Sequence, residues 1–172
     1  MKKPKRRNPD TDRKSDNYKR RLDPSPDPDA LLKLSQIAVY VGISKHKYAP
    51  LAFGLEQYTG AKDEDRTMCD RDADFGVQDM TRAQTILRNG IAAGLVGKDN
   101  GKRMVWGIDQ TGWVFEARIT NPTQHIYHGY PVRASEAVAE YVLARFATWC
   151  SSHGSERDKA VLKAAQDRYE VK

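Results

Sequence analysis

The segment GWVFEARITNPTQHIYHGYPV, residues 112–132, restricts the fold of this chain more than any other segment. Apolar and polar side chains alternate on both sides of NPTQ, as they do in two strands that each bury one face. RMVWGID, which precedes this segment, predicts a further strand joined through a short turn at QTG. We therefore expect an antiparallel β-meander of three strands within residues 103–132.

Amphipathic segments surround the predicted meander. DMTRAQTILRNGIAAGLVG carries apolar residues at helical spacing, with Asp79 or Thr81 as its N-cap and a glycine near its end. SEAVAEYVLARFATWC, capped by Ser135, and ERDKAVLKAAQDRYE predict two more helices near the C-terminus. Helices packed against a small antiparallel sheet make an α+β fold, which we expect to span residues 30–172 as one domain.

The stretch before the first of these helices is less clearly patterned. From Asp29, an apolar spacing of three and four residues predicts a short helix. The β-branched run at 37–43 either continues this helix or forms a strand, and periodicity leaves both open. Residues 44–76 mix charges with glycine and proline and predict a long loop. Loops of this length are uncommon in compact domains, and the ordered ones are often functional.

Positive charge is concentrated at the N-terminus. Residues 1–23 contain ten Lys or Arg and four Asp, a net charge of +6, and the remaining residues hold 19 charges of each sign. Residues 1–29 also contain five of the eight prolines and few apolar side chains. Such a segment buries too little surface to offset its ordering entropy, so we expect it to be disordered or bound in extended form. The basic residues predicted to attract nucleic acid here are Lys2, Lys3, Lys5, Arg6 and Arg7.

The polar residues of the predicted hairpin are candidates for chemistry. Glu116 and Arg118 lie two residues apart on one strand and therefore share a face. Which residues of the next strand join them depends on the register, because a shift of one residue exchanges the two faces. If Thr120 pairs with His125, Arg118 faces Tyr127.

If the same threonine pairs with Ile126 instead, Arg118 faces His128 and Glu116 faces Tyr130. We favour this register because it gathers four chemically active side chains on one face. Cleavage of RNA without a metal needs a base near the ribose 2′-hydroxyl, an acid for the leaving oxygen and a fixed cation for the phosphate. A carboxylate, an imidazole and a guanidinium supply these roles.

SKHKYAP contains a second candidate group. His46 lies between Lys45 and Lys47, whose charges lower the pKa of its imidazole, and a nearby phosphate would reverse that effect. We expect His46 to take part in catalysis, and the two lysines to bind nucleic acid together with Tyr127 and Tyr130. The acidic run KDEDRTMCDRDAD lacks the ligand order of an EF-hand, and we expect neither a metal nor another cofactor.

Two resemblances accompany these motifs. The string SKHK…DRTMCD…GIAAGLV…MVWGID…VFEARITN…YHGYPV, within residues 44–132, resembles an uncharacterised family of short bacterial proteins. A helix followed by a β-meander that bears Glu, Arg and His is similar to the architecture of barnase-like and colicin-type ribonuclease toxins. The second resemblance implies that Glu116 is a base, Arg118 a phosphate clamp and His128 an acid.

Two functions follow as hypotheses. The first is a small bacterial metal-independent endoribonuclease that acts as a toxin or defence effector. The second is a non-catalytic adaptor, whose basic tail docks on nucleic acid or an acidic partner while the neutral domain binds another protein. No stretch approaches the roughly 18 apolar residues that a membrane span needs. Since the two cysteines also form no metal or redox motif, we expect a cytoplasmic protein without a membrane partner.

Overall fold

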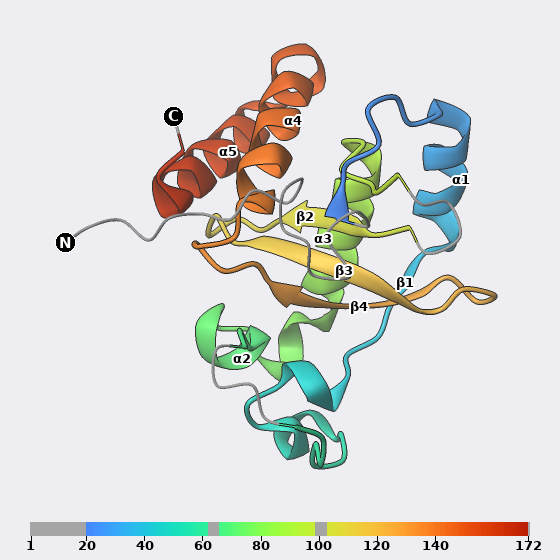
Figure 1. Cartoon of the computed structure of the whole chain (residues 1–172), viewed down its shortest axis with the longest axis vertical. Helices are drawn as coiled ribbons and strands as arrows, with labels where there is room; N and C mark the ends of the chain where they lie inside the picture. The colour runs from blue at the N-terminus through green and yellow to red at the C-terminus, as the bar shows by residue number, and fades with distance from the viewer. Residues whose placement is uncertain (1–19, 62–65, 99–102, 172) are drawn as a thin grey trace.

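Four strands form one sheet within residues 20–61, 66–98 and 103–171, which the computed structural model describes (Figure 1). The strands are β1 (Val39–Tyr40), β2 (Val105–Ile108), β3 (Val114–Asn121) and β4 (Ile126–Pro131), in the spatial order β1-β4-β3-β2. β2, β3 and β4 pair antiparallel, which confirms the expected meander, and β1 pairs parallel to β4. The run at 37–43 thus contributes a short strand to the sheet.

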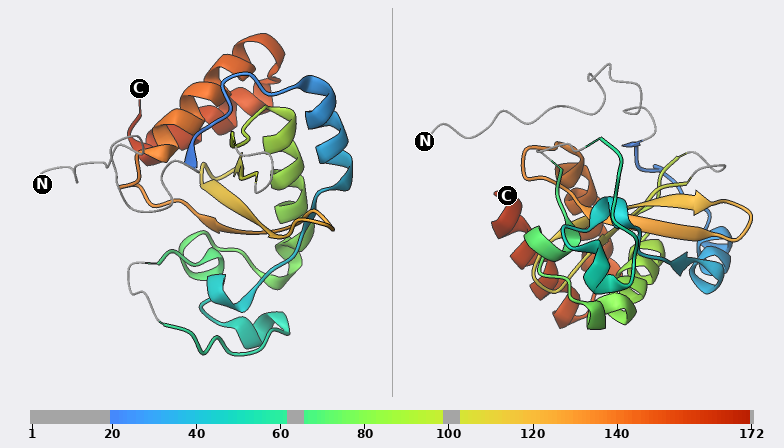
Figure 2. Two further views of the ribbon diagram at one scale, coloured as in Figure 1. Left: turned by 45° about the vertical axis from the view of Figure 1, so that its right-hand side comes forward. Right: turned by 90° about the horizontal axis from the view of Figure 1, so that it is seen from below.

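Helices cover both faces of this sheet (Figure 2). α1 (Pro28–Ile37) and α3 (Met80–Ala92) lie on one face, and α4 (Val138–His153) and α5 (Glu156–Tyr169) lie on the other. The described part of the predicted loop contains the short elements η2 (Ser44–His46), η3 (Pro50–Phe53) and α2 (Cys69–Asp72), and η4 (Val77–Asp79) follows it directly. The α+β class is therefore confirmed, with a mixed sheet instead of a purely antiparallel one. Among the described residues, no helix is long and apolar enough to cross a membrane.

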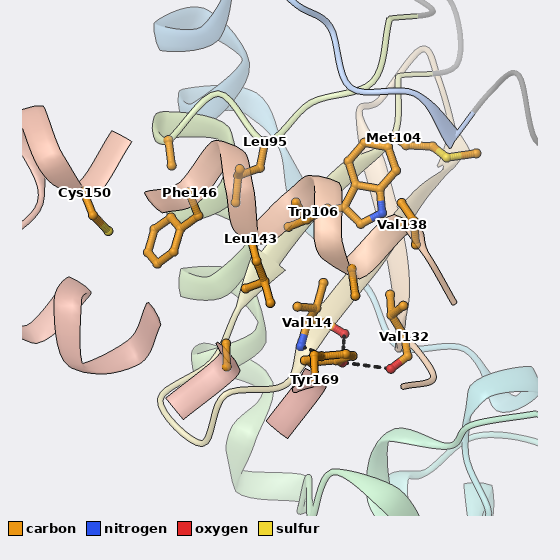
Figure 3. Close-up of a cluster of buried hydrophobic side chains, with 14 residues drawn as sticks. Leu95, Met104, Trp106, Val114, Val132, Val138, Leu143, Phe146, Cys150 and Tyr169 are labelled. Atoms are coloured by element: carbon orange, nitrogen blue, oxygen red, sulfur yellow. Dashed lines mark hydrogen bonds between the residues drawn. The ribbon is translucent and has the colours of Figure 1, made fainter. Parts of the chain in front are cut away.

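The first half of β3 is buried on both faces. Phe115 and Ala117 pack on the side of α3, whereas Val114 joins the core under α4 and α5. Figure 3 shows that second core, in which Trp106 of β2 and Tyr169 of α5 are also fully buried. Burying one large apolar side chain stabilises a fold by roughly 1.5–3 kcal/mol, so both cores hold the meander in place. Glu116, the polar residue between these apolar ones, is buried with them.

Two glycines allow α3 to lie directly on β2. A Cβ atom added at Gly90 would stand 2.0 Å from the carbonyl oxygen of Trp106, and one at Gly107 would stand 2.5 Å from Cγ2 of Ile86. Side chains do not approach other atoms this closely, so the helix and the strand could not keep their present separation with any other residue at either position.

Two helices begin at residues other than those that the sequence indicated. α1 is capped by Asp27, whose carboxylate accepts a hydrogen bond from a backbone amide of the first turn at 3.1 Å, so the helix begins before Asp29. α4 begins at Val138, three residues after the predicted cap Ser135. The intervening Glu136 instead forms ion pairs with two arginines, which keep this stretch in a turn.

Residues 20–29, which the sequence assigned to the tail, pack against the rest of the described chain. The amide of Asp23 donates to the carbonyl oxygen of Val96 at 2.8 Å, and the amide of Lys98 donates to that of Arg21 at 3.0 Å. These bonds hold residues 21–23 in extended form beside the end of the α3 segment. The predicted nucleic-acid contacts Lys2, Lys3, Lys5, Arg6 and Arg7 lie outside the described residues.

Removing the hydroxyl of Tyr169 should destabilise this fold. The hydroxyl accepts a hydrogen bond from the amide of Val114 at 3.1 Å and donates one to the carbonyl oxygen of Val132 at 2.8 Å (Figure 3). In Tyr169→Phe both buried backbone groups lose this partner, so we expect the free energy of unfolding in urea to fall by about 1–3 kcal/mol. Tyr48→Phe, at a tyrosine that is 68% exposed, is the matched control. Equal stability of the two variants would contradict the role given to the buried hydroxyl.

Candidate functional site

The pairing of β3 with β4 brings the polar residues of the hairpin together. Arg118 lies opposite His128, and Glu116 lies opposite Tyr130, so the favoured cross-strand pairs are confirmed. All four residues share the face of the sheet that α4 and α5 cover further along. The arginine is half-exposed, whereas the carboxylate beside it is completely buried.

The pairing predicted at the loop is wrong, because a β-bulge interrupts the ladder. Asn121, and not Thr120, pairs with Ile126, with a register shift between Ile119 and Asn121. A bulge adds one residue to one strand and turns its side chain in a new direction. Here the hydroxyl of Thr120 lies 2.5 Å from Nδ1 of His128, and this contact fixes the plane of the imidazole.

Four side chains donate to the carboxylate of Glu116. Oε1 accepts from Nε of Arg118 at 2.9 Å and from the hydroxyl of Tyr130 at 2.5 Å. Oε2 accepts from Nε of Arg20 at 2.7 Å and from the indole Nε1 of Trp106 at 3.2 Å. A carboxylate that has lost all contact with water needs such charged and hydrogen-bonding partners.

The charges around Glu116 keep it ionised. Burial would raise the pKa of this carboxyl, but the positive charges of Arg20 and Arg118 and the hydrogen bond from Tyr130 lower it below its usual value. Burial and the same carboxylate raise the pKa of Tyr130, which therefore remains a hydrogen-bond donor. The carboxylate thus orients two guanidinium groups and one phenol.

A pocket of about 490 Å³ opens beside this network. The described residues that line it are Arg20, Lys45, His46, Arg66, Thr67, Arg118, Ile119, His128, Tyr130, Arg133 and Glu136. Five of these are Lys or Arg and one is acidic. Even with the buried Glu116 counted, five positive charges meet two negative ones, and this excess favours an anionic ligand.

Two histidines from distant segments stack in this pocket. The ring centroids of His46 and His128 lie 5.2 Å apart with an interplanar angle of 15°, and His46 also lies 4.7 Å from the ring of Tyr130. The parallel pairing of β1 with β4 directs the chain after β1 along β4, which brings η2 and His46 to this place. Nδ1 of His46 is buried and has no hydrogen-bond partner among the described residues.

Both imidazoles are neutral at neutral pH. Burial lowers the pKa of His46 to about 3, and the charges of His128, Lys45 and Arg66 act in the same direction. Burial, Arg118 and Lys45 likewise lower the pKa of His128. A bound anion would offset these positive charges and raise the pKa of each ring.

Five of the residues predicted from the sequence therefore meet in one pocket. They are Lys45, His46, Arg118, His128 and Tyr130. Lys45 and His46 come from η2, and the other three come from β3 and β4. The cross-strand pairs of these three residues are the ones that the favoured register predicted. The catalytic and binding roles predicted for them remain predictions.

Lys47 and Tyr127, predicted as nucleic-acid contacts, are buried elsewhere, which corrects that prediction. Lys47 is 5% exposed, and its Nζ lies 4.5 Å from the centroid of the Phe53 ring. Tyr127 is 1% exposed, because alternation along β4 turns it to the face that α3 covers. Each lies next to a pocket residue in the sequence and on the other side of the backbone in space.

Burial also corrects the role of base predicted for Glu116. Its side chain has no exposed surface, and each of its oxygens already accepts two hydrogen bonds. It has no free position from which to take a proton from a bound molecule. Its effect on the pocket passes through the groups that it holds.

Several pocket residues carry no signal in the sequence. Arg20 lies 96 residues from Glu116, and its Nη1 also donates to Glu136 at 2.6 Å. Arg66 and Arg133 also line the pocket, and an isolated arginine belongs to no recognisable sequence pattern. The single available signal for Arg20 was its place among the basic residues of the N-terminus, and that signal named no partner.

Comparisons with protein families, with curated proteins and with solved structures find no match to this chain. The resemblances to a bacterial family and to ribonuclease toxins therefore remain predictions. Within the described residues, no group of three or more His, Cys, Asp or Glu side chains is arranged to hold a metal ion. The chemistry of the pocket follows from its imidazoles and its positive charges.

Replacing Glu116 by glutamine should destabilise the protein and change how stability depends on pH. The variant leaves Arg20 and Arg118 without their shared anion, at a cost of roughly 3–5 kcal/mol in unfolding free energy. Because folding lowers the pKa of Glu116 from 4.5, its contribution is present above that pH and is lost as pH falls further. Urea unfolding at several pH values should therefore show that wild type has the higher free energy of unfolding, and that its difference from the variant becomes smaller below pH 4.5.

Glu56→Gln, at an exposed glutamate, is the control for that measurement. It removes one carboxylate without touching a buried arginine. A Glu116→Gln protein as stable as Glu56→Gln would show that the buried ion pairs do not organise the pocket.

Proposed function

We propose that the pocket binds a phosphodiester of RNA and that the protein is a metal-independent endoribonuclease. The observation that carries this proposal is the pair of stacked, neutral imidazoles inside a pocket with an excess of positive charge. The positive charges attract and hold a phosphate. Two imidazoles at one phosphate can accept and donate the protons that transfer of the phosphate to the ribose 2′-oxygen requires.

We assign the base to His46 and the acid to His128. A base has to be neutral, and burial keeps the imidazole of His46 neutral in the free protein, whereas a phosphate bound beside it raises its pKa and makes it a better proton acceptor. His128 is less buried and takes up a proton more readily once a phosphate lies beside it. The 2′-oxygen then attacks phosphorus while its proton passes to His46. The bond from phosphorus to the 5′-oxygen breaks, and that oxygen receives the proton of His128.

The guanidinium groups of Arg118 and Arg20 stabilise the charge that builds on the phosphate oxygens in this step. Both are fixed through Nε by Glu116, so little reorganisation is needed when the charge develops. Glu116 acts here as a positioning residue. This assignment replaces the carboxylate base of the ribonuclease resemblance by a second histidine.

The direct test is cleavage of single-stranded RNA in the presence of EDTA. We expect the wild-type protein to leave 2′,3′-cyclic phosphate ends. His46→Ala and His128→Ala should each lower the cleavage rate by roughly 10²- to 10⁴-fold, the usual contribution of a general acid or base. His153→Ala, at an exposed histidine on α4, is the matched control and should cleave as wild type does.

Circular dichroism of each variant shows whether it is folded before its activity is compared. Equal cleavage by all three folded variants would reject the histidine mechanism. RNA binding without cleavage by the wild type would instead favour the adaptor hypothesis, in which the pocket is a docking site.

The pH profile gives an independent test of the same assignment. Cleavage needs His128 protonated, and its pKa in the free protein lies below the ordinary 6.5 of histidine. As pH rises through that pKa, the protonated fraction is lost. The value of kcat/KM should therefore decline on the alkaline side with a midpoint below pH 6.5, and a midpoint above this value would contradict the assignment.

A further inference from the structure

A second hollow of about 540 Å³ adjoins the pocket and is also basic. Of the described residues that line it, four are basic and none is acidic; the basic ones are Arg20, Arg21, Lys98 and Arg145. We call this hollow the basic groove. One wall is the extended stretch at 20–24, and the other is α4.

Arg20 lines both the pocket and the basic groove. Its Nε donates to Glu116 and its Nη1 donates to Glu136. Its third nitrogen, Nη2, is buried and has no hydrogen-bond partner among the described residues. A ligand cannot contact this buried nitrogen directly, but the positive charge of Arg20 lies at the boundary of the two hollows and attracts an anion in either of them.

The wall formed by α4 presents one continuous stripe to the groove. The residues of this stripe follow the spacing of three and four that places side chains on one face of a helix; they are Tyr141, Ala144, Arg145 and Thr148. Tyr141 is 44% exposed, although it is a large aromatic residue. An exposed aromatic ring beside several cations is the combination that binds single-stranded nucleic acid, by stacking on a base while the cations contact phosphates.

We infer that the basic groove is a second subsite for single-stranded RNA, in which a strand continues from the pocket across Arg20. Arg21 and Lys98 of the groove contact two neighbouring phosphates, and Tyr141 stacks on an unpaired base. This inference rests on the proposed function, because it takes the pocket to hold the phosphodiester that is cleaved. Continuity of the two hollows through Arg20 favours one extended polyanion over two separate small anions.

The charge of the groove is tested with a short single-stranded oligouridylate whose 2′-oxygens are methylated, so that it binds without cleavage. In the full chain, the double variant Arg21→Gln/Lys98→Gln removes two exposed cations of the groove. The control Lys33→Gln/Arg88→Gln removes two exposed cations on α1 and α3. Fluorescence anisotropy over a range of salt concentrations gives the affinity and its salt dependence.

Each phosphate contact to a single strand contributes about 0.7 to the slope of log affinity against log salt concentration. The groove variant should therefore bind more weakly and have a slope shallower by about 1.4, whereas the control keeps the wild-type slope. Tyr141→Ala should lower the affinity roughly fivefold or more at an unchanged slope, and Tyr141→Phe should retain it. Equal slopes for the groove variant and its control would overturn the inference.

Cleavage of two substrates separates this inference from the proposed function. A dinucleotide occupies only the pocket, so the groove variant should cleave it at the wild-type rate and cleave a longer single strand more slowly. Equal rates on the longer strand for the groove variant and its control would overturn the inference and leave the function intact. A wild-type protein that cleaves neither substrate would overturn the proposed function, and the salt slopes would still decide the groove.

Discussion

The arrangement of the site depends on one buried charge, the carboxylate of Glu116. A carboxylate inside a protein is unstable unless cations and hydrogen-bond donors replace the water that it has lost. At Glu116 those donors come from β2, β3, β4 and the stretch that precedes α1. One side chain thus ties the middle strand of the meander to a segment 96 residues earlier. Removing any partner leaves a buried charge without its counter-charge or a buried acceptor without its donor. The network is therefore kept or lost as a unit.

The pocket lies where the cover of the sheet ends. α4 and α5 bury the first residues of β3 on this face, and towards Arg118 the strand comes out from under them. Polar side chains at that margin lie beside a low-dielectric core and remain partly open to solvent, where charges act more strongly than at a free surface. The parallel pairing of β1 with β4 brings a further side chain to this margin. The chain that follows β1 runs along β4, so His46 of η2 stacks on the ring of His128.

Positive charge then defines what this margin can bind. The imidazoles are neutral because the cations around them oppose a further positive charge, and the same cations attract an anion that would reverse the effect. Arg20 extends the positive surface from the pocket into the basic groove, and it does so from a fixed position, held by two carboxylates. The proposed ribonuclease and its second subsite are therefore two consequences of one arrangement of arginines around the buried Glu116 and the partly buried Glu136.

The sequence by itself determined the local features of this protein. Period-two alternation specified the meander but left two registers open, and the structure selected the one that places Arg118 opposite His128. Helical spacing specified α3 and α5. These features depend on neighbouring residues, which a sequence displays directly.

Tertiary structure alone decided the rest. Alternation cannot say that a second layer of helices buries the polar face, which made Glu116 a structural charge instead of a base. It also cannot place Arg20, because a contact across 96 residues leaves no periodic trace. Lys47 lies two residues after Lys45, and Tyr127 lies directly before His128. Both are nevertheless buried on the other side of the backbone and do not line the pocket.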